Sequence, residues 1–131
     1  MATITGIHHI ALTVQDADRS VGWYQDLLGM QVLLHADEED VRLRVLIHPD
    51  SGVILGLRQY PARSDGAFDE HRTGLDHFAL AVSSRAELEA WEGVLRDRGV
   101  PFTPIVETPI GTVVVVRDPD NVQVELWLPL G

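Results

Sequence analysis

The chain has 131 residues, a net charge of −10 and no cysteine, and its length suits one ordinary domain. The acidic charge and ten scattered basic residues exclude nucleic acid as an expected partner, because a polyanion would be repelled. The lack of cysteine excludes disulfides, thiolate metal ligands and a cysteine nucleophile, so any metal must be held by imidazole, carboxylate or neutral oxygen ligands.

The first half of the chain predicts a strand, a helix and three further strands. Apolar residues alternate with small ones at residues 9–14, as in a half-buried strand. The following helix is capped by Asp16 or Asp18 and ends at Gly29. Turn residues at 49–52 predict a hairpin between the last two strands. The three later strands are expected at residues 31–35, 41–47 and 53–59.

The second half predicts the same order of elements. A strand at residues 78–82 is followed by a helix, whose start carries Ser84 and, three residues later, Glu87, the pattern of a capping box. Gly99 and then Pro101 end this helix. The remaining strands are expected at residues 102–106, 112–117 and 122–128, with a turn before the last.

The two halves are copies of one unit. GIHHIALTV at residues 6–14 and GLDHFALAV at residues 74–82 agree at five of nine positions, and the helices and turns that follow agree in order. We therefore predict an α+β fold of two βαβββ modules, at about 4–60 and about 74–129, within a single domain. Residues 61–73 are expected to connect them, because neither module buries its sheet alone.

Strand parity places one histidine of each module on the sheet face that does not pack on the helix. Alternate residues of a strand point to opposite faces, so His9 shares a face with Ala11 and Thr13, and His77 takes the same place in the second module. Small neighbours leave room for a ligand beside a polar group. His8 has the opposite parity and is interpreted as a residue that supports a ligand or the fold.

The last strand adds a carboxylate, Glu125, in an otherwise apolar segment. A buried carboxylate is costly unless it is paired or bound to a metal. Taken singly, each histidine also fits a hydrogen-bonded core residue and Glu125 an exposed strand residue, but their matched positions favour a metal. We predict one divalent ion, of Fe, Mn, Zn or Ni, held by His9, His77 and Glu125 as a facial triad. The expected substrate-pocket residues are Ala11, Thr13, Gln123 and Trp127.

With these motifs the chain resembles the glyoxalase, bleomycin-resistance and extradiol-dioxygenase superfamily, also called vicinal oxygen chelate. The matching segments are HIAL with Val14, LDHFA from Leu75, and DPDN followed by VEL near the end, and they span nearly the whole chain. The resemblance implies paired modules whose mixed sheets curl around a metal, in homodimers whose cup in many members draws modules from two chains. It places His9, His77 and Glu125 on the family's metal positions.

One family metal position is not filled by a ligand here. It falls on Leu55 or Gly56, and neither side chain can bind a metal. This departs from the four-ligand pattern of glyoxalase I and methylmalonyl-CoA epimerase, and it resembles the three-ligand pattern of extradiol dioxygenases and fosfomycin thiol transferases. Against the transferases, the chain shows no basic cluster for a phosphonate, and Ala11 stands where those enzymes carry threonine.

Two functions are weighed from these residues. The favoured one is a metal-dependent enzyme acting on a small oxygen-bearing substrate by lyase, dioxygenase or transferase chemistry, with the ion as Lewis acid and Glu125 as the catalytic residue. His48, Tyr60 and His71 are the acid–base candidates. The alternative is a non-catalytic, antibiotic-type binding and resistance protein, for which the acidic charge favours a cationic ligand. A partner-binding protein of the same fold has no positive support in the sequence.

The cellular location of the protein is predicted from the lack of a membrane-spanning segment and of a signal peptide. No apolar run approaches the ~20 residues that a membrane span needs, and the first residues lack the charged n-region of a signal peptide. We expect a cytoplasmic homodimer that binds a small molecule and does not bind membranes.

Overall fold

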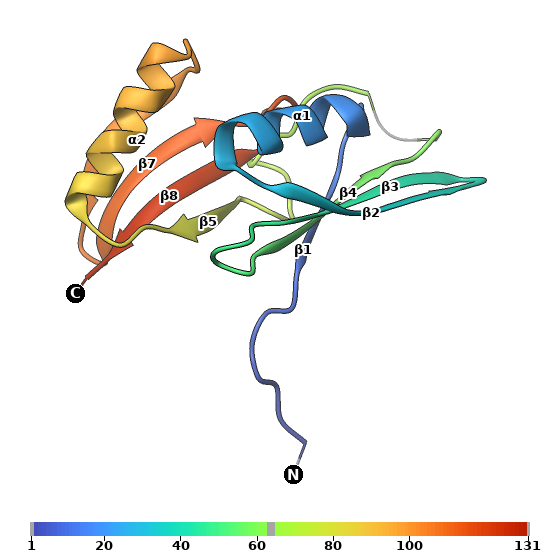
Figure 1. Ribbon diagram of the computed structural model, residues 1–131, viewed down its shortest axis with the longest axis horizontal. Helices are drawn as coiled ribbons and strands as arrows, with labels where there is room; N and C mark the ends of the chain where they lie inside the picture. Colours follow the sequence, from blue (N-terminus) through green and yellow to red (C-terminus); the bar gives the residue numbers. More distant parts are fainter. Residues whose placement is uncertain (1, 63–64, 131) are drawn as a thin grey trace. The chain divides into compact units, whose positions relative to one another are not determined.

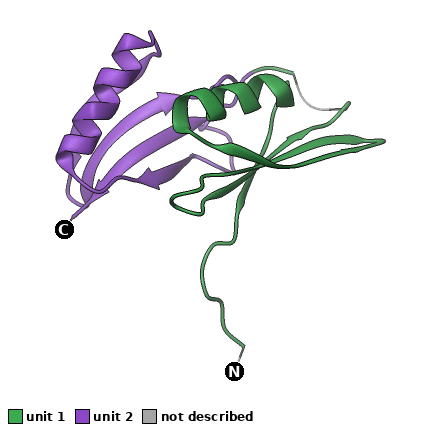
Figure 2. Ribbon diagram, viewed as in Figure 1, with its two compact units in different colours: residues 1–66 green, residues 67–131 purple. Residues whose placement is uncertain are grey.

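The computed structural model describes residues 2–62 and 65–130, in two compact units that divide between Gly66 and Ala67 (Figure 2). Each unit contains one βαβββ module, which confirms the predicted α+β fold of two modules. The grouping of both units into a single domain stays a prediction. Among the described residues, no helix is long and apolar enough to cross a membrane.

Unit 1 is a four-stranded mixed sheet with one helix on one of its faces (Figure 1). Its strand order is β1-β4-β3-β2, with β1 parallel to β4 and the other pairs antiparallel. β2 is three residues longer than predicted, because its pairing with β3 continues to the tip of the turn. The elements are β1 (Ile10–Thr13), α1 (Ala17–Leu28), β2 (Gln31–Glu38), β3 (Val41–Ile47) and β4 (Ile54–Gln59).

Unit 2 repeats this arrangement with the order β5-β8-β7-β6, and β5 is parallel to β8 (Figure 1). The parallel pair matters for function, because it places the first and last strands of the module side by side in the sheet. The elements are β5 (His77–Ala81), α2 (Arg85–Asp97), β6 (Phe102–Thr108), β7 (Gly111–Arg117) and β8 (Gln123–Pro129).

The helix ends follow the sequence signals. Of the two candidates, Asp16 caps α1, and its Oδ1 accepts a hydrogen bond of 3.1 Å from the backbone N–H three residues later. Gly29 ends α1 in the left-handed conformation, at φ 72°. Ser84 caps α2 by accepting from the N–H of Glu87 at 3.1 Å, and Gly99 follows the helix at φ 66°.

Each sheet has a helix-covered face, which forms the core of its unit, and a helix-free face. Alternation along β1 is clear, since Leu12 is buried while Ala11 and Thr13 are exposed. The strand registers assign the remaining residues. The helix-free face of unit 1 includes Ala11, Thr13, Leu43, Val45, Ile54, Gly56 and Arg58. The helix-free face of unit 2 includes His77, Ala79, Ala81, Val113, Val115, Arg117, Gln123, Glu125 and Trp127.

The later part of the predicted connector packs on unit 2. The N–H of Phe68 donates to the carbonyl of Asp120 at 2.7 Å. Arg117 of β7 donates from both terminal nitrogens to Glu70, at 3.0 and 2.9 Å. These bonds attach residues 68–70 to the sheet. Residues 63 and 64 of the predicted connector lie outside the described residues.

The Glu70–Arg117 pair predicts a pH dependence of stability. The hydrogen bond from Arg117 holds the pKa of Glu70 at about 2, below its ordinary value of 4.5. The pair therefore stabilises the fold above the unfolded pKa, and this contribution is lost as pH falls from about 4.5 towards 2. Free energies of unfolding from urea titrations at stepwise pH should fall more steeply in this window for the native chain than for Glu70→Gln. Parallel curves for the two proteins would contradict the prediction.

Candidate functional site

His77 and Glu125 lie together on the helix-free face of unit 2. They come from the neighbouring parallel strands β5 and β8, with Ala79 opposite Glu125 in the register. Nε2 of His77 is 3.3 Å from Oε1 of Glu125. The Glu125 side chain is 12% exposed and the His77 side chain 41% exposed, so the carboxylate is buried while the imidazole is accessible from solvent.

Asp76 fixes the tautomer of the His77 ring. Oδ1 of Asp76 lies 2.7 Å from Nδ1 of His77, and an ionised carboxylate can only accept, so the proton is on Nδ1. A neutral ring in this tautomer presents a lone pair from Nε2 to the carboxylate of Glu125. Two lone pairs at this separation repel each other unless a second proton or a metal ion lies between them.

The separation of the two ligand atoms suits a shared ion. Two atoms bound at about 2.1 Å to one ion, at tetrahedral or octahedral angles, lie roughly 3.0–3.4 Å apart. The Nε2–Oε1 distance of 3.3 Å falls within this range. The donor set, one neutral imidazole and one carboxylate, also suits the divalent ions of the first transition row.

Gln123 contacts Asp76, the residue that holds the ring of His77. Its amide nitrogen donates to the backbone carbonyl of Asp76 at 3.1 Å and to Oδ1 of Asp76 at 3.3 Å. Metal-binding histidines commonly donate their other N–H to a carboxylate that is itself held by hydrogen bonds. Gln123, predicted as a pocket residue, thus contacts the carboxylate that orients the ring.

His9 belongs to unit 1 and directly precedes β1. Nδ1 of His9 is 2.9 Å from Nδ1 of His8. The residue before each predicted ligand histidine therefore contacts its Nδ1 rather than its Nε2, through Asp76 in unit 2 and His8 in unit 1. The structure brings His77 and Glu125 together, and the participation of His9 stays a prediction.

The register settles which residue of unit 1 corresponds to Glu125. Ala11 pairs with Gly56 in unit 1, as Ala79 pairs with Glu125 in unit 2. Gly56 rather than Leu55 is therefore the counterpart of Glu125, and it has no side chain that could bind a metal.

The other predicted residues have separate environments. Ala11 and Thr13 are exposed on the helix-free face of unit 1, and Trp127 is half-buried on that of unit 2. Nδ1 of His48 lies 2.7 Å from Oγ of Ser51 within the turn between β3 and β4, which indicates a role in the turn.

A second group of possible ligands consists of Asp69, Glu70 and His71, whose ligand atoms lie within 4.8 Å of one another. Each already has a partner. His71 pairs with Asp69 at 2.9 Å, which raises the pKa of His71, and Glu70 binds Arg117. A metal ion bound here would have to displace these ion pairs. We therefore do not regard this cluster as the metal site.

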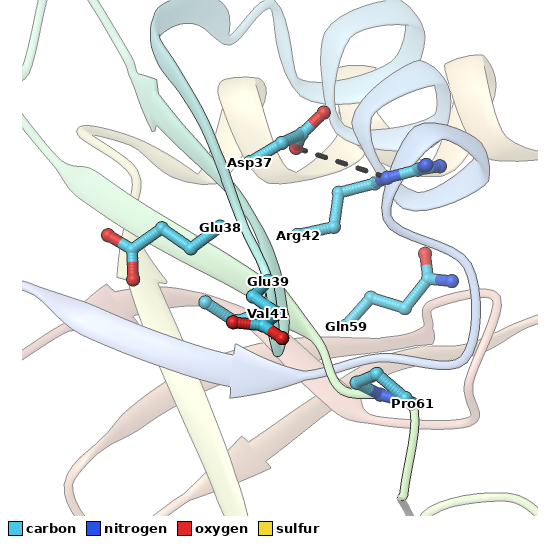
Figure 3. A pocket seen from close by; sticks show the side chains of 7 residues that line it. All are labelled: Asp37, Glu38, Glu39, Val41, Arg42, Gln59 and Pro61. Carbon is cyan, nitrogen blue, oxygen red and sulfur yellow. Dashed lines mark ion pairs between the residues drawn. The ribbon is translucent and has the colours of Figure 1, made fainter.

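A hollow of about 300 Å³ lies at the end of the β2–β3 hairpin in unit 1. Figure 3 shows Asp37 and Arg42 pointing towards each other across it, with 3.9 Å between Nε and Oδ1. No histidine and none of the predicted site residues is among the residues that line it. The lining residues are Asp37, Glu38, Glu39, Val41, Arg42, Gln59 and Pro61.

Two residues with clear roles in the structure, Asp76 and Arg44, were not predicted from the sequence. Asp76 precedes the predicted ligand His77 in the repeat, as His8 precedes His9, and this position was the available signal. Arg44 is 5% exposed and donates to Asp37 of β2 and Asp18 of α1. It ties the helix to the sheet on the helix-covered face, and its role is structural.

Comparison with known proteins gives a consistent result. The sequence model of the Glyoxalase/Bleomycin resistance protein/Dioxygenase superfamily matches residues 6–126. An uncharacterized protein of Bacillus subtilis (strain 168), YwkD, is 26% identical over 127 residues, which cover 95% of this chain and 97% of that protein. A glyoxylase/bleomycin resistance protein/dioxygenase domain from Frankia sp. EAN1pec is 33% identical, with a TM-score of 0.89 over 98% of this chain and 100% of that chain.

Two more distant structures share the fold. The fosfomycin resistance protein FosX of Listeria monocytogenes, in a mutant complexed with Mn(II) and 1S,2S-dihydroxypropylphosphonic acid, is 16% identical with a TM-score of 0.73, over 98% of this chain and 95% of that chain. The antibiotic binding protein TnmS3 of Streptomyces sp. CB03234 is 19% identical with a TM-score of 0.77, over 99% of this chain and 100% of that chain.

Proposed function

Because the chain belongs to the glyoxalase/bleomycin resistance protein/dioxygenase superfamily, we propose that it is a metal-dependent enzyme acting on a small oxygen-bearing substrate. Its divalent ion, of Fe, Mn, Zn or Ni, is held by His77 and Glu125, with His9 as the third ligand. The proposal includes a homodimer, in which His9 comes from the same chain or from the second copy. A monomer mass in light scattering would contradict the dimer.

One observation carries the proposal. Asp76 contacts Nδ1 of His77, so Nε2 of the ring is directed at the carboxylate of Glu125, 3.3 Å away. A divalent ion between these atoms relieves the repulsion, and the exposed ring leaves coordination positions for a substrate. The Mn(II) complex of FosX, which shares the fold, supports a metal at a site of this kind.

When bound, the ion supplies Lewis-acid chemistry that stabilises negative charge on a substrate oxygen. The chain's own residues hold and orient the ligands. Glu125 contributes a buried charge, Asp76 holds the ring of His77, and Gln123 holds Asp76. The half-buried indole of Trp127, two residues after Glu125 on the same strand face, is placed to line the pocket.

The non-catalytic alternative is favoured by the fold shared with TnmS3 and by the net charge of −10. It has no need for a bare Nε2 facing a carboxylate, so metal content separates the two functions. Purified protein should carry, or take up, one transition-metal ion per chain, measured by elemental analysis and native mass spectrometry. A chain that binds no Mn, Fe, Zn or Ni ion under any loading condition would rule out the enzyme proposed here.

Removing the carboxylate behind His77 should weaken metal binding. We expect Asp76→Ala to lower the affinity for Mn²⁺ roughly 10–100-fold, as for other outer partners of metal-binding histidines, because the ring loses its fixed tautomer and orientation. Isothermal titration measures the change. Asp50→Ala removes the same charge from the exposed β3–β4 turn and should bind like the native chain. Equal losses in both variants would indicate a general charge effect.

A further inference from the structure

Arg58 is a basic residue in an otherwise apolar and small-residue region of unit 1. It lies on the helix-free face, paired with Thr13 of β1 and Leu43 of β3, and it is half-buried. Among the described strand residues it is the only basic side chain on this face. The nearest carboxylate assigned to the face, Glu38, lies two strands away at the end of the β2–β3 hairpin.

The guanidinium of Arg58 has no hydrogen-bond or ion-pair partner within the described part of the chain, whereas its counterparts are paired. Arg117, on the helix-free face of unit 2, is bound by Glu70, and Glu125 faces His77. Arg44, on the opposite face of the same sheet as Arg58, is bound by Asp37. A half-buried guanidinium without a protein partner is available to bind a group from outside the described chain.

The neighbours of Arg58 on this face are small or uncharged. Along β4 the next residue on the same face is Gly56, and the residue opposite Gly56 on β1 is Ala11. A Cβ at Gly56 would contact the Cβ of Ala11 at 3.4 Å and two backbone atoms at 3.8 Å, so β1 and β4 pack closely here and no long side chain stands between His9 and Arg58 on this face. The two residues paired with Arg58 are Thr13, which carries a hydroxyl group, and Leu43, which carries an apolar side chain.

The predicted metal ligand of unit 1 lies along the same strand face. His9 precedes β1 with the parity of Ala11 and Thr13, and it is four residues, or roughly 13 Å, from Thr13. We propose that Arg58 binds the anionic group of a small substrate with an apolar body, whose other end carries the oxygen atoms for the metal. The metal-binding end of this substrate rests on the proposed function. The contact between the anionic group and Arg58 does not depend on the ion.

An arginine fork binds planar carboxylates and tetrahedral phosphoryl groups through paired hydrogen bonds. The overall charge of −10 repels such anions, so a local cation is needed to hold one. Both chemistries therefore fit Arg58, and probes of each kind distinguish them.

The test is calorimetric titration of the full chain, loaded with Mn²⁺ and metal-free, with benzoate, phenylphosphonate and the neutral analogue benzamide. We expect one or both anions to bind saturably and benzamide to bind at least roughly tenfold more weakly, because a hydrogen bond to a charged group is lost. Arg58→Gln should lower anion affinity roughly tenfold or more, and Arg58→Lys should keep part of it.

Arg42→Gln is the matched control. It removes the same charge from β3 on the helix-covered face, where Arg42 makes only long ion pairs of 3.6 and 3.9 Å, and exposed pairs of this kind contribute little. Anion affinity should stay within about twofold of the native value. Thermal melts of all variants establish that each is folded.

The outcomes separate the two proposals. Anion binding that needs Arg58, in a chain that takes up no metal, supports this inference and contradicts the proposed enzyme. Metal uptake with equal anion affinity in the native chain and Arg58→Gln contradicts the inference alone. Absence of saturable anion binding up to about 10 mM, or equal binding of benzamide, also overturns it.

Discussion

Replacing His77 with alanine is expected to lower the affinity of the chain for a divalent ion by roughly 100-fold. Structural zinc sites bind with about 10–16 kcal/mol shared among four ligands, or about 3 kcal/mol for each. His77 supplies the ring nitrogen that Asp76 has oriented, at 3.3 Å from the carboxylate. Glu125→Gln keeps the volume of the side chain and removes its charge, and we expect a loss of the same order.

The measurement is titration with Mn²⁺ and Zn²⁺, followed by native mass spectrometry of the loaded chains. His35→Ala is the control, because this exposed histidine lies on β2, at the opposite edge of the unit 1 sheet from β1. It should bind metal like the native chain. If His77→Ala and Glu125→Gln also bind like the native chain, the ligands have been misassigned.

The largest expected effect on stability comes from Gly111→Ala. Gly111 begins β7 at φ 153°, a conformation that residues with a side chain rarely adopt. A Cβ there would lie 2.5 Å from the carbonyl oxygen of Leu128 and 2.7 Å from Nε1 of Trp127. Backbone strain and overpacking each cost about 1–3 kcal/mol, so we expect a loss of roughly 2–4 kcal/mol.

Thermal and urea unfolding of the variant should show this loss as a melting temperature lower by roughly 10 °C. The contrast is Gly93→Ala in the interior of α2, where no atom lies within 4 Å of an added Cβ. That change should stabilise by roughly 0.5–1 kcal/mol, because alanine favours the helix. A Gly111→Ala chain as stable as the native one would show that Leu128 and Trp127 shift at little cost.

The repeated pattern in the sequence was sufficient to predict the elements and the faces of the strands. Two copies of one motif placed His9 and His77 at matching positions, and the alternation around Glu125 put its carboxylate on the side of His77. The parallel pairing of β5 with β8 then brings these two side chains to within 3.3 Å. The alternation of side chains along each strand and the repeated order of elements in the two modules therefore account for much of the candidate site.

The remaining features depend on contacts that strand parity does not determine. Asp76 lies just before β5, and its side chain turns to Nδ1 of the next residue, a rotation that alternation cannot predict. Arg44 finds its partners 7 and 26 positions away, on β2 and α1. The sequence does not show that Arg58 lacks a charged neighbour, because the strand register decides which residues lie beside it on the sheet.

The central claim is tested most directly by locating an ion in crystals of Mn²⁺-loaded protein through anomalous diffraction at the manganese edge. We predict one strong anomalous peak within about 2.0–2.2 Å of both Nε2 of His77 and Oε1 of Glu125, with the Asp76 contact retained. A peak at Asp69 and His71 instead, or a crystal of metal-loaded protein with no peak between His77 and Glu125, would contradict the account.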